Sequence, residues 1–251
     1  MNPVFAALQP VSREERARAY ADPQWRAKAL AGWKTGFGFG IRWDTYTIGE
    51  SVTHPELVGR RLAEVAEERG TSVFDALLDL ALEEPKLALR VTVVIANDDE
   101  PEVARLLVEE HCTLGLSDAG AHAGQLCDAP QATDLLGNWV RGRQVMTVEE
   151  AVRRLTSVQA DLFGIVDRGT LRPGAWADVV VFDPDTVAPG PLRRVRDFPA
   201  DSERLTADQP TGVHHVLVNG QAVVRDGALV ETDARPGQVV RPAARDRGAR
   251  V

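Results

Sequence analysis

The chain has 251 residues, a formal net charge of −8 and 44% hydrophobic residues. This is ordinary globular composition, which excludes wholesale disorder, collagen and coiled coil. An acidic chain lacks the basic footprint of a nucleic-acid-binding protein, and no apolar run approaches the roughly 18 residues of a membrane span. The first residues show no basic patch followed by an apolar core, so we expect no secretory signal. Cys112 and Cys127 make no disulfide framework, which favours a cytoplasmic protein.

The first third of the chain favours helices. Ser12 can cap a helix, with Glu15 as its capping-box partner, so helical structure is expected over 12–32. The glycine-rich stretch 32–40 fits no phosphate-binding pattern, and we interpret it as a loop. Apolar residues at helical spacing then predict two helices within 58–84, with acidic residues on the solvated faces.

Strands and helices alternate in the middle of the chain. The β-branched run 87–96 is typical of a strand that is buried on both faces. Thr147 with Glu150 forms another capping box, which predicts a helix start. The other elements expected here are short strands at 41–48 and 113–116 and helices at 101–110, 133–141, 147–155 and up to residue 163. This order predicts an α/β chain with a parallel sheet or a segment of a barrel.

The character of the chain changes after Gly164, where short apolar runs are broken by turns. Strands are expected at 177–182, 213–218 and 221–225, which make a small β-rich module. Asn219-Gly220 is a strong two-residue hairpin signal between the last two of these strands. Residues 184–211 are rich in Pro, Arg and Asp and predict a long surface loop, and 232–251 predicts a flexible tail.

The sharpest candidate site is the run from Ser117 to His122, which follows the short strand expected at 113–116. In a parallel α/β architecture, ligands bind at the carboxyl ends of strands. The Asp118 carboxylate could bind a divalent metal or accept a proton from metal-bound water. His122 could donate a hydrogen bond to a substrate carboxylate or oxyanion. On these residues alone, the alternative that Asp118 merely caps a helix or turn stays open.

Other polar groups favour structural roles. The acidic run 97–100 could line a site, but an N-cap ahead of Pro101 is the preferred interpretation. His214-His215 lies in an expected strand, where alternation sends one ring in and the other out. The sequence contains no GxSxG, HExxH or HxH, which excludes several hydrolytic constellations within this chain.

Several segments resemble one family. Residues 169–182 closely resemble the G-x-L-x-P-G-x-x-A-D-x-V-V-F segment of the amidohydrolase superfamily, and 216–220 resembles its V-x-V-N-G hairpin. Residues 155–164 resemble the helix that follows the last barrel strand in that superfamily. Residues 59–80 resemble a G-x-x-L-x-E-x-A…D-A-x-x-D-L stretch of the N-acyl-D-amino-acid deacylases, which are the most similar group. The resemblance runs from Trp43 to Gly227.

This resemblance implies a fold and a chemistry. It implies the last strands and helices of a TIM-like (β/α) barrel over 1–165, part of a small β-sandwich over 166–231, and a flexible tail over 232–251. Such enzymes use one or two divalent metals, usually zinc, to hydrolyse the amide bond of a small N-acyl amino acid. Asp118 would be general base and then general acid, and also a metal ligand. Ser117 and His122 would contact the substrate.

The sequence departs from the family in its metal ligands. The family site needs an HxH pair, a bridging carboxylate or thiolate and further histidines, but the five histidines of this chain include no such pair. We therefore expect the C-terminal half of a hydrolase, whose exposed apolar edges would favour homo-oligomers or a missing N-terminal half as partner. The alternatives are a non-catalytic remnant, or another amidohydrolase activity such as cyclic amide or dipeptide hydrolysis.

Overall fold

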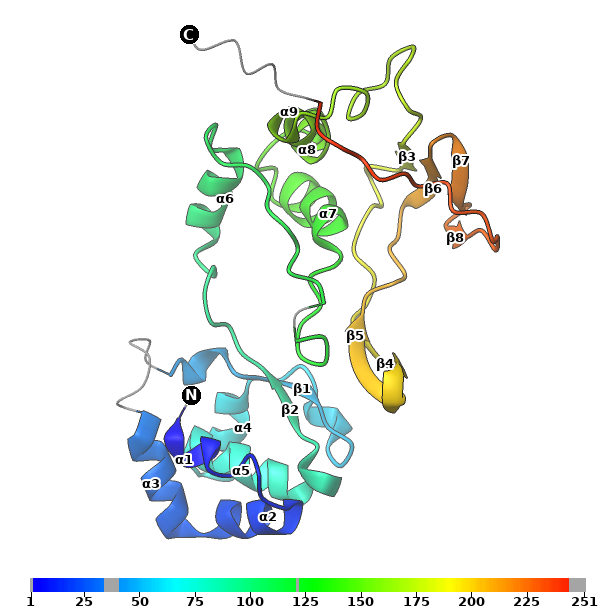
Figure 1. Ribbon diagram of the computed structural model, residues 1–251. Helices are drawn as coiled ribbons and strands as arrows, with labels where there is room; N and C mark the ends of the chain where they lie inside the picture. Colours follow the sequence, from blue (N-terminus) through cyan, green and yellow to red (C-terminus); the bar gives the residue numbers. More distant parts are fainter. Residues whose placement is uncertain (1, 34–40, 121, 244–251) are drawn as a thin grey trace. The chain divides into compact units, whose positions relative to one another are not determined.

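Figure 1 shows the computed structural model of the chain, which describes residues 2–33, 41–120 and 122–243. Most of the glycine-rich stretch expected as a loop (34–40) and the end of the expected tail (244–251) lie outside the described residues. The chain divides into two compact units, Met1–Asp98 and Asp99–Val251. Within the described ranges, no helix is long and apolar enough to cross a membrane.

The first unit is mainly helical, as its sequence predicts. Its elements are α1 (Pro3–Ala6), α2 (Arg13–Ala21), α3 (Pro23–Trp33), β1 (Thr47–Glu50), α4 (Leu62–Arg69), α5 (Val73–Glu83) and β2 (Arg90–Thr92). The Ser12 hydroxyl accepts a hydrogen bond from Glu15 N at 3.2 Å, and the Glu15 carboxylate accepts one from Ser12 N at 3.0 Å. The predicted capping box is therefore confirmed, and Gly70 ends α4 in a left-handed conformation.

Two apolar clusters hold this unit together. Ile48, Leu62 and Leu80 are fully buried in the first, which joins β1, α4 and α5. The second is aromatic, and the rings of Trp33 and Phe74 meet edge to face with centroids 5.4 Å apart. Helices of this length are marginal in isolation, so tertiary burial of their apolar faces supplies most of their stability.

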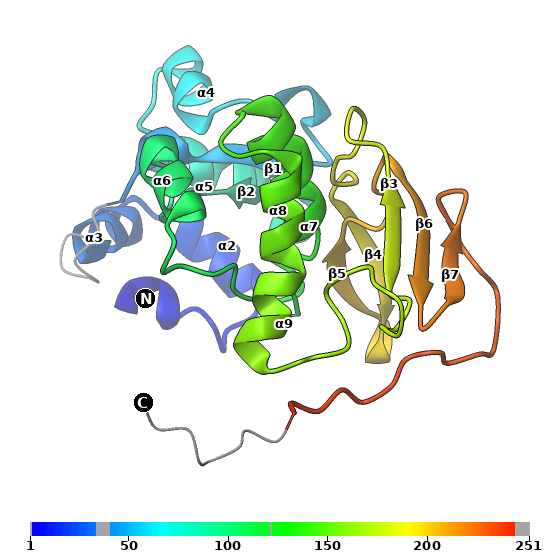
Figure 2. The ribbon, with the colours of Figure 1, turned by 90° about the horizontal axis from the view of Figure 1, so that it is seen from above.

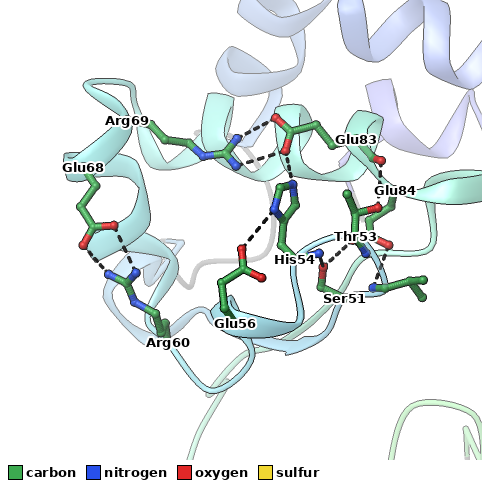
Figure 3. A network of polar contacts seen from close by, with 10 residues as sticks. Ser51, Thr53, His54, Glu56, Arg60, Glu68, Arg69, Glu83 and Glu84 are labelled. Atoms are coloured by element: carbon green, nitrogen blue, oxygen red, sulfur yellow. Dashed lines mark hydrogen bonds and ion pairs between the residues drawn. The ribbon is translucent and has the colours of Figure 1, made fainter.

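A polar network fastens the loop after β1 to the end of α5 (Figure 3). Glu84 is buried, and its carboxylate accepts hydrogen bonds from Val52 N and Thr53 N, both at 3.0 Å. The Ser51 hydroxyl donates to the same carboxylate. Burial raises the pKa of Glu84, but these hydrogen bonds outweigh burial and hold the pKa below its usual value. The ionised Glu84 carboxylate therefore holds residues 51–53 of the loop in place.

Glu83 extends this network on the surface. Arg69 Nη1 donates to Glu83 Oε1 at 2.8 Å, and His54 Nε2 lies 2.6 Å from Glu83 Oε2 (Figure 3). The hydrogen bond from Arg69 holds the pKa of Glu83 below its usual value. Glu83 therefore ties α4 and the loop that holds His54 to α5.

The strand expected at 87–96 is much shorter than predicted. Only β2 is a strand, and it pairs antiparallel with β1. Lys86 and Leu87 adopt positive φ angles of 61° and 57° in a 3-10 turn, which breaks the extended run at its start. Ile95 is 76% exposed, so the β-branched run is not buried on both faces. A strand that is buried on both faces needs a covering layer on each face, and the described residues do not provide both for this run.

The second unit combines helices with antiparallel sheets. Its elements are α6 (Glu100–Val108), α7 (Gln131–Asp134) with a π-helical continuation (Leu135–Gly142), α8 (Val148–Leu155), α9 (Ser157–Phe163), β3 (Val179–Phe182), β4 (Arg193–Phe198), β5 (Ser202–Thr206), β6 (Val213–Val218), β7 (Gln221–Arg225) and β8 (Ala228–Leu229). Figure 2 shows α7, α8 and α9 on one side of this unit and the strands on the other. Leu135, Leu136, Ala151 and Val187 are buried in its core.

Sequence reasoning was right about some strands of this unit and wrong about others. The predicted strands β3, β6 and β7 are present, and the hairpin turn has Asn219 at φ 49° and Gly220 at φ 81°. The long surface loop expected at 184–211 is wrong, because it contains the β4–β5 hairpin. Its charged residues pair across the strands, as in the Arg204–Asp197 ion pair at 2.7 Å. A search for alternating apolar residues does not detect such charge pairing.

The short strand expected at 113–116 is also absent. Leu116 is 81% exposed, and the segment bonds to side chains instead of a neighbouring strand. Gln159 Nε2 donates to Leu114 O at 3.0 Å, and Gln131 Nε2 donates to Gly115 O at 3.3 Å. Every strand pair among the described residues is antiparallel, so the predicted parallel pairing is wrong for them. The chain is α/β with several sheets, none of them closed within the described residues.

We expect the Glu150 carboxylate to stabilise the second unit in a pH-dependent way. Hydrogen bonds from Arg153 and then Arg154 lower the pKa of Glu150 from 4.5 to about 2. A depressed folded-state pKa adds stability above pH 4.5 that is lost as the pH falls toward 2. Urea unfolding of the wild type and of Glu150→Gln should therefore differ most above pH 4.5 and converge toward pH 2. A difference that is constant over this range would contradict the expectation.

Candidate active site

The three residues predicted for the site lie in the loop between α6 and α7. Asp118 and His122 both adopt left-handed backbone conformations, with φ angles of 54° and 49°. Such angles are uncommon outside glycine, although Asp, Asn and His are enriched among the exceptions. The Ser117 hydroxyl accepts a hydrogen bond from Ala119 N at 3.3 Å, which closes a tight turn around Asp118.

Ser117 and Asp118 line a pocket of about 570 Å³. Leu107, Leu135 and Trp139 form part of its apolar wall, and Asp128 and Asp134 add further carboxylates. His122 is exposed and does not line this pocket. The structure therefore brings Ser117 and Asp118 to one pocket but leaves the third predicted residue outside it.

The Asp118 carboxylate is available for chemistry. Among the described residues, no hydrogen bond or ion pair engages the side chain of Asp118 or Asp128. Asp118 therefore does not cap a turn through its side chain, which was the alternative open from the sequence. Asp99 does cap α6 by accepting from Glu102 N at 3.2 Å, as preferred from the sequence.

The hairpin β4–β5 holds the loop that follows Asp118. Leu205 N donates to Ala123 O at 2.7 Å, and Arg194 Nη1 donates to Gly124 O at 2.9 Å. Glu203 lies 3.3 Å from the same guanidinium nitrogen and keeps it directed at the loop. Sequence reasoning missed Arg194 because the hairpin itself was predicted as a loop. The site thus depends on a strand pair distant in sequence.

Removing the Arg194 guanidinium should loosen this loop. We expect Arg194→Ala to raise amide hydrogen exchange over 122–126 about tenfold, because a charged hydrogen bond to the Gly124 carbonyl is lost. Arg193→Ala is the matched control, since Arg193 pairs with the exposed Asp208 instead. Equal exchange in the two variants, measured by mass spectrometry, would remove Arg194 from this role.

The described residues do not make a zinc site. Among them, no group of three or more His, Cys, Asp or Glu side chains is arranged to hold a metal ion. Zinc sites in enzymes use at least three protein ligands at about 2 Å. Asp118 could supply one oxygen, but the described carboxylates and histidines do not complete the set.

Comparison with known proteins places the chain in a family. The Amidohydrolase family matches residues 43–224, which is most of the chain. This chain belongs to the Amidohydrolase family. The match nearly coincides with the span from Trp43 to Gly227 over which the sequence resembles that superfamily, so the predicted resemblance is confirmed.

Two curated relatives from Alcaligenes xylosoxydans xylosoxydans are deacylases. An N-acyl-D-glutamate deacylase is 37% identical over 82% of this chain and 38% of its own length. A D-aminoacylase is 35% identical over 74% of this chain and 34% of its own length. This member of the Amidohydrolase family therefore spans well under half the length of these relatives.

Two solved structures also match this chain over part of their length. The crystal structure of N-acyl-D-glutamate deacylase from Bordetella bronchiseptica, complexed with zinc and a phosphonate inhibitor, is 37% identical. The match covers 79% of this chain and 38% of the chain in that crystal structure, with a TM-score of 0.44. A crystal structure of D-aminoacylase is 32% identical, covers 75% of this chain and 36% of that chain, and has a TM-score of 0.43.

Proposed function

We propose that this chain carries the C-terminal part of a metal-dependent N-acyl-D-amino-acid deacylase, in which Asp118 transfers the proton. The observation that carries the proposal is the Asp118 carboxylate, which has no side-chain partner among the described residues and lines a pocket in a chain of the Amidohydrolase family. The deacylase relatives support the reaction class. The proposed substrate is a small N-acyl-D-amino acid. The proposed location is the cytoplasm, which the two free cysteines favour.

The proposed reaction is hydrolysis of the amide bond. Water adds to the acyl carbon, the carbon–nitrogen bond breaks, and a carboxylate and a D-amino acid leave. Asp118 accepts the proton of the attacking water and passes it to the departing amine nitrogen. Ser117, which shares the pocket, is proposed to contact the substrate. His122 is exposed and lies outside the pocket, and its contact with the substrate stays a proposal from the sequence.

The proposed architecture is shared between segments. We propose that residues 1–165 belong to a TIM-like barrel, that 166–231 belong to a β-sandwich and that 232–251 form a tail. Asp118 would supply one zinc ligand, and the remaining ligands would come from outside the described residues, because these residues alone do not make a complete site. The exposed segment 113–116 would then gain a neighbouring strand from the partner segment, either an N-terminal half or another copy of the chain.

The test combines metal content with turnover. The purified chain is assayed with zinc on N-acetyl-D-amino acids, alone and mixed with the part of the Alcaligenes N-acyl-D-glutamate deacylase that the chain does not match. We expect neither stoichiometric zinc nor turnover from the chain alone, and both from the mixture. Turnover by the chain alone would overturn the shared site. Inactivity of the mixture, with both parts folded, would favour a non-catalytic remnant, and a panel of L-acyl compounds, dipeptides and cyclic amides tests the other hydrolase activities.

A further inference from the structure

We infer that the pocket beside Asp118 accepts an uncharged apolar group and rejects a second carboxylate. The preferred substrates are then N-acyl derivatives of neutral D-amino acids, and not of D-glutamate or D-aspartate. This inference rests on the proposed deacylase function and specifies its substrate class. It sets the chain apart from the relative that is an N-acyl-D-glutamate deacylase, although the two are 37% identical.

The shape and wall of the pocket suit an apolar group. Leu107 of α6 faces the same pocket as Leu135 and Trp139 of the π-helical segment after α7. Leu135 is buried in the core of the unit, so this part of the wall is fixed by packing. A pocket of about 570 Å³ has room for an acyl or aliphatic side chain. The transfer of an apolar group from water to such a wall is favourable.

The charge of the pocket has one sign. Asp118, Asp128 and Asp134 line it, and among the described residues no lysine, arginine or histidine does. The Glu100 carboxylate and, more weakly, the Asp134 carboxylate raise the pKa of Arg143. The Arg143 guanidinium already pairs with Glu100 and stacks on Trp139, 5.0 Å from the ring centroid. Arg143 is therefore already paired and does not line the pocket.

An anionic side chain would meet this excess of carboxylates. Two like charges repel at short range, and the repulsion is stronger beside a protein wall than in bulk water. Every N-acyl-D-amino acid carries the same α-carboxylate, so that group cancels in a comparison between substrates. The side-chain charge is then the variable, and D-glutamine against D-glutamate varies it at nearly constant shape. Specificity of this kind arises from repulsion of the wrong ligand as much as from attraction of the right one.

The experiment measures binding and turnover separately. Dissociation constants of N-acetyl-D-leucine, N-acetyl-D-glutamine and N-acetyl-D-glutamate are measured for the full chain by NMR titration. The values of kcat/KM are measured for the active mixture. We expect glutamate to be disfavoured against glutamine by about tenfold or more at low salt, and less so at high salt. The double variant D128N/D134N should reduce that ratio toward one, while Asp161→Asn, an exposed position on α9, should leave it unchanged.

The outcomes separate the two proposals. Equal binding of glutamate and glutamine, no binding of any of the three, or an unchanged ratio in D128N/D134N would overturn the pocket inference. Selective binding without turnover in any mixture would overturn the deacylase proposal and leave the inference about the pocket standing. Turnover with a preference for glutamate would do the reverse.

Discussion

Replacing Asp118 by asparagine should lower kcat of the active mixture by about 10²- to 10⁴-fold, which is the usual contribution of a general acid–base group. Asparagine has nearly the shape of aspartate but cannot accept the proton of the attacking water. It also tolerates the left-handed backbone that Asp118 adopts at φ 54°, so the loop should keep its conformation. The expected signature is a large fall in kcat with a small change in KM.

Asp201→Asn is the matched control for this experiment. Asp201 is also exposed and also has a left-handed backbone, with φ 54°, but it lies in the β4–β5 turn, outside the pocket. The same chemical change in the same backbone conformation should leave kcat within about twofold, as surface substitutions usually do. Residual turnover of Asp118→Asn close to that of the control would remove Asp118 from the mechanism.

Local signals in the sequence predicted the helices well. A capping box uses residues three apart, so Ser12 with Glu15 identifies the start of α2 without knowledge of any distant contact. Thr147 also caps α8, because its side chain accepts a hydrogen bond from Glu150 N, but only this half of the predicted capping box is seen: the Glu150 carboxylate bonds to Arg153 and Arg154. Glycine in a left-handed conformation ends α4 and α9, again through bonds within the last turn.

Strands depend on partners that local patterns do not specify. The apolar segment 113–116 has strand-like residues, yet among the described residues no strand lies beside it to accept its hydrogen bonds. The hairpin β4–β5 is rich in charged residues, and these pair across its register: Arg196 stands opposite Glu203, and the Arg194 guanidinium also lies 3.3 Å from the Glu203 carboxylate. Cross-strand pairing is a property of two segments, and the pattern of either one alone does not indicate it.

The candidate site was predictable only in part for the same reason. The proximity of Ser117 and Asp118 follows from their adjacency in sequence. Asp128 and Asp134 reach the same pocket only because the loop folds back before α7, which no spacing rule anticipates. The sequence offered one hint for this arrangement: Asp128 lies just before Pro130, where α7 begins. The charge of the pocket, which decides the substrate class inferred above, is therefore a result of the fold.

The largest expected loss of stability comes from Gly212→Ala. Gly212 has φ 68°, and a Cβ atom there would lie 2.4 Å from Val187 N and 2.6 Å from Val187 Cα. Val187 is 1% exposed and belongs to the core of the second unit. Gly212 O also accepts a hydrogen bond from Asp183 N at 2.8 Å, so the two segments cannot simply move apart. The left-handed strain of about 1–2 kcal/mol adds to an overpacking cost of about 1–3 kcal/mol.

Gly174→Ala separates these two contributions. Gly174 has φ 87°, and nothing lies within 4 Å of the position its Cβ would take. This variant should therefore lose only the backbone contribution of about 1–2 kcal/mol. Urea unfolding, with hydrogen exchange of the β6 amides to report on the second unit, should show Gly212→Ala as the less stable variant. Equal losses would mean that the contact between Gly212 and Val187 can relax, and that the core around Val187 is less rigid than its burial implies.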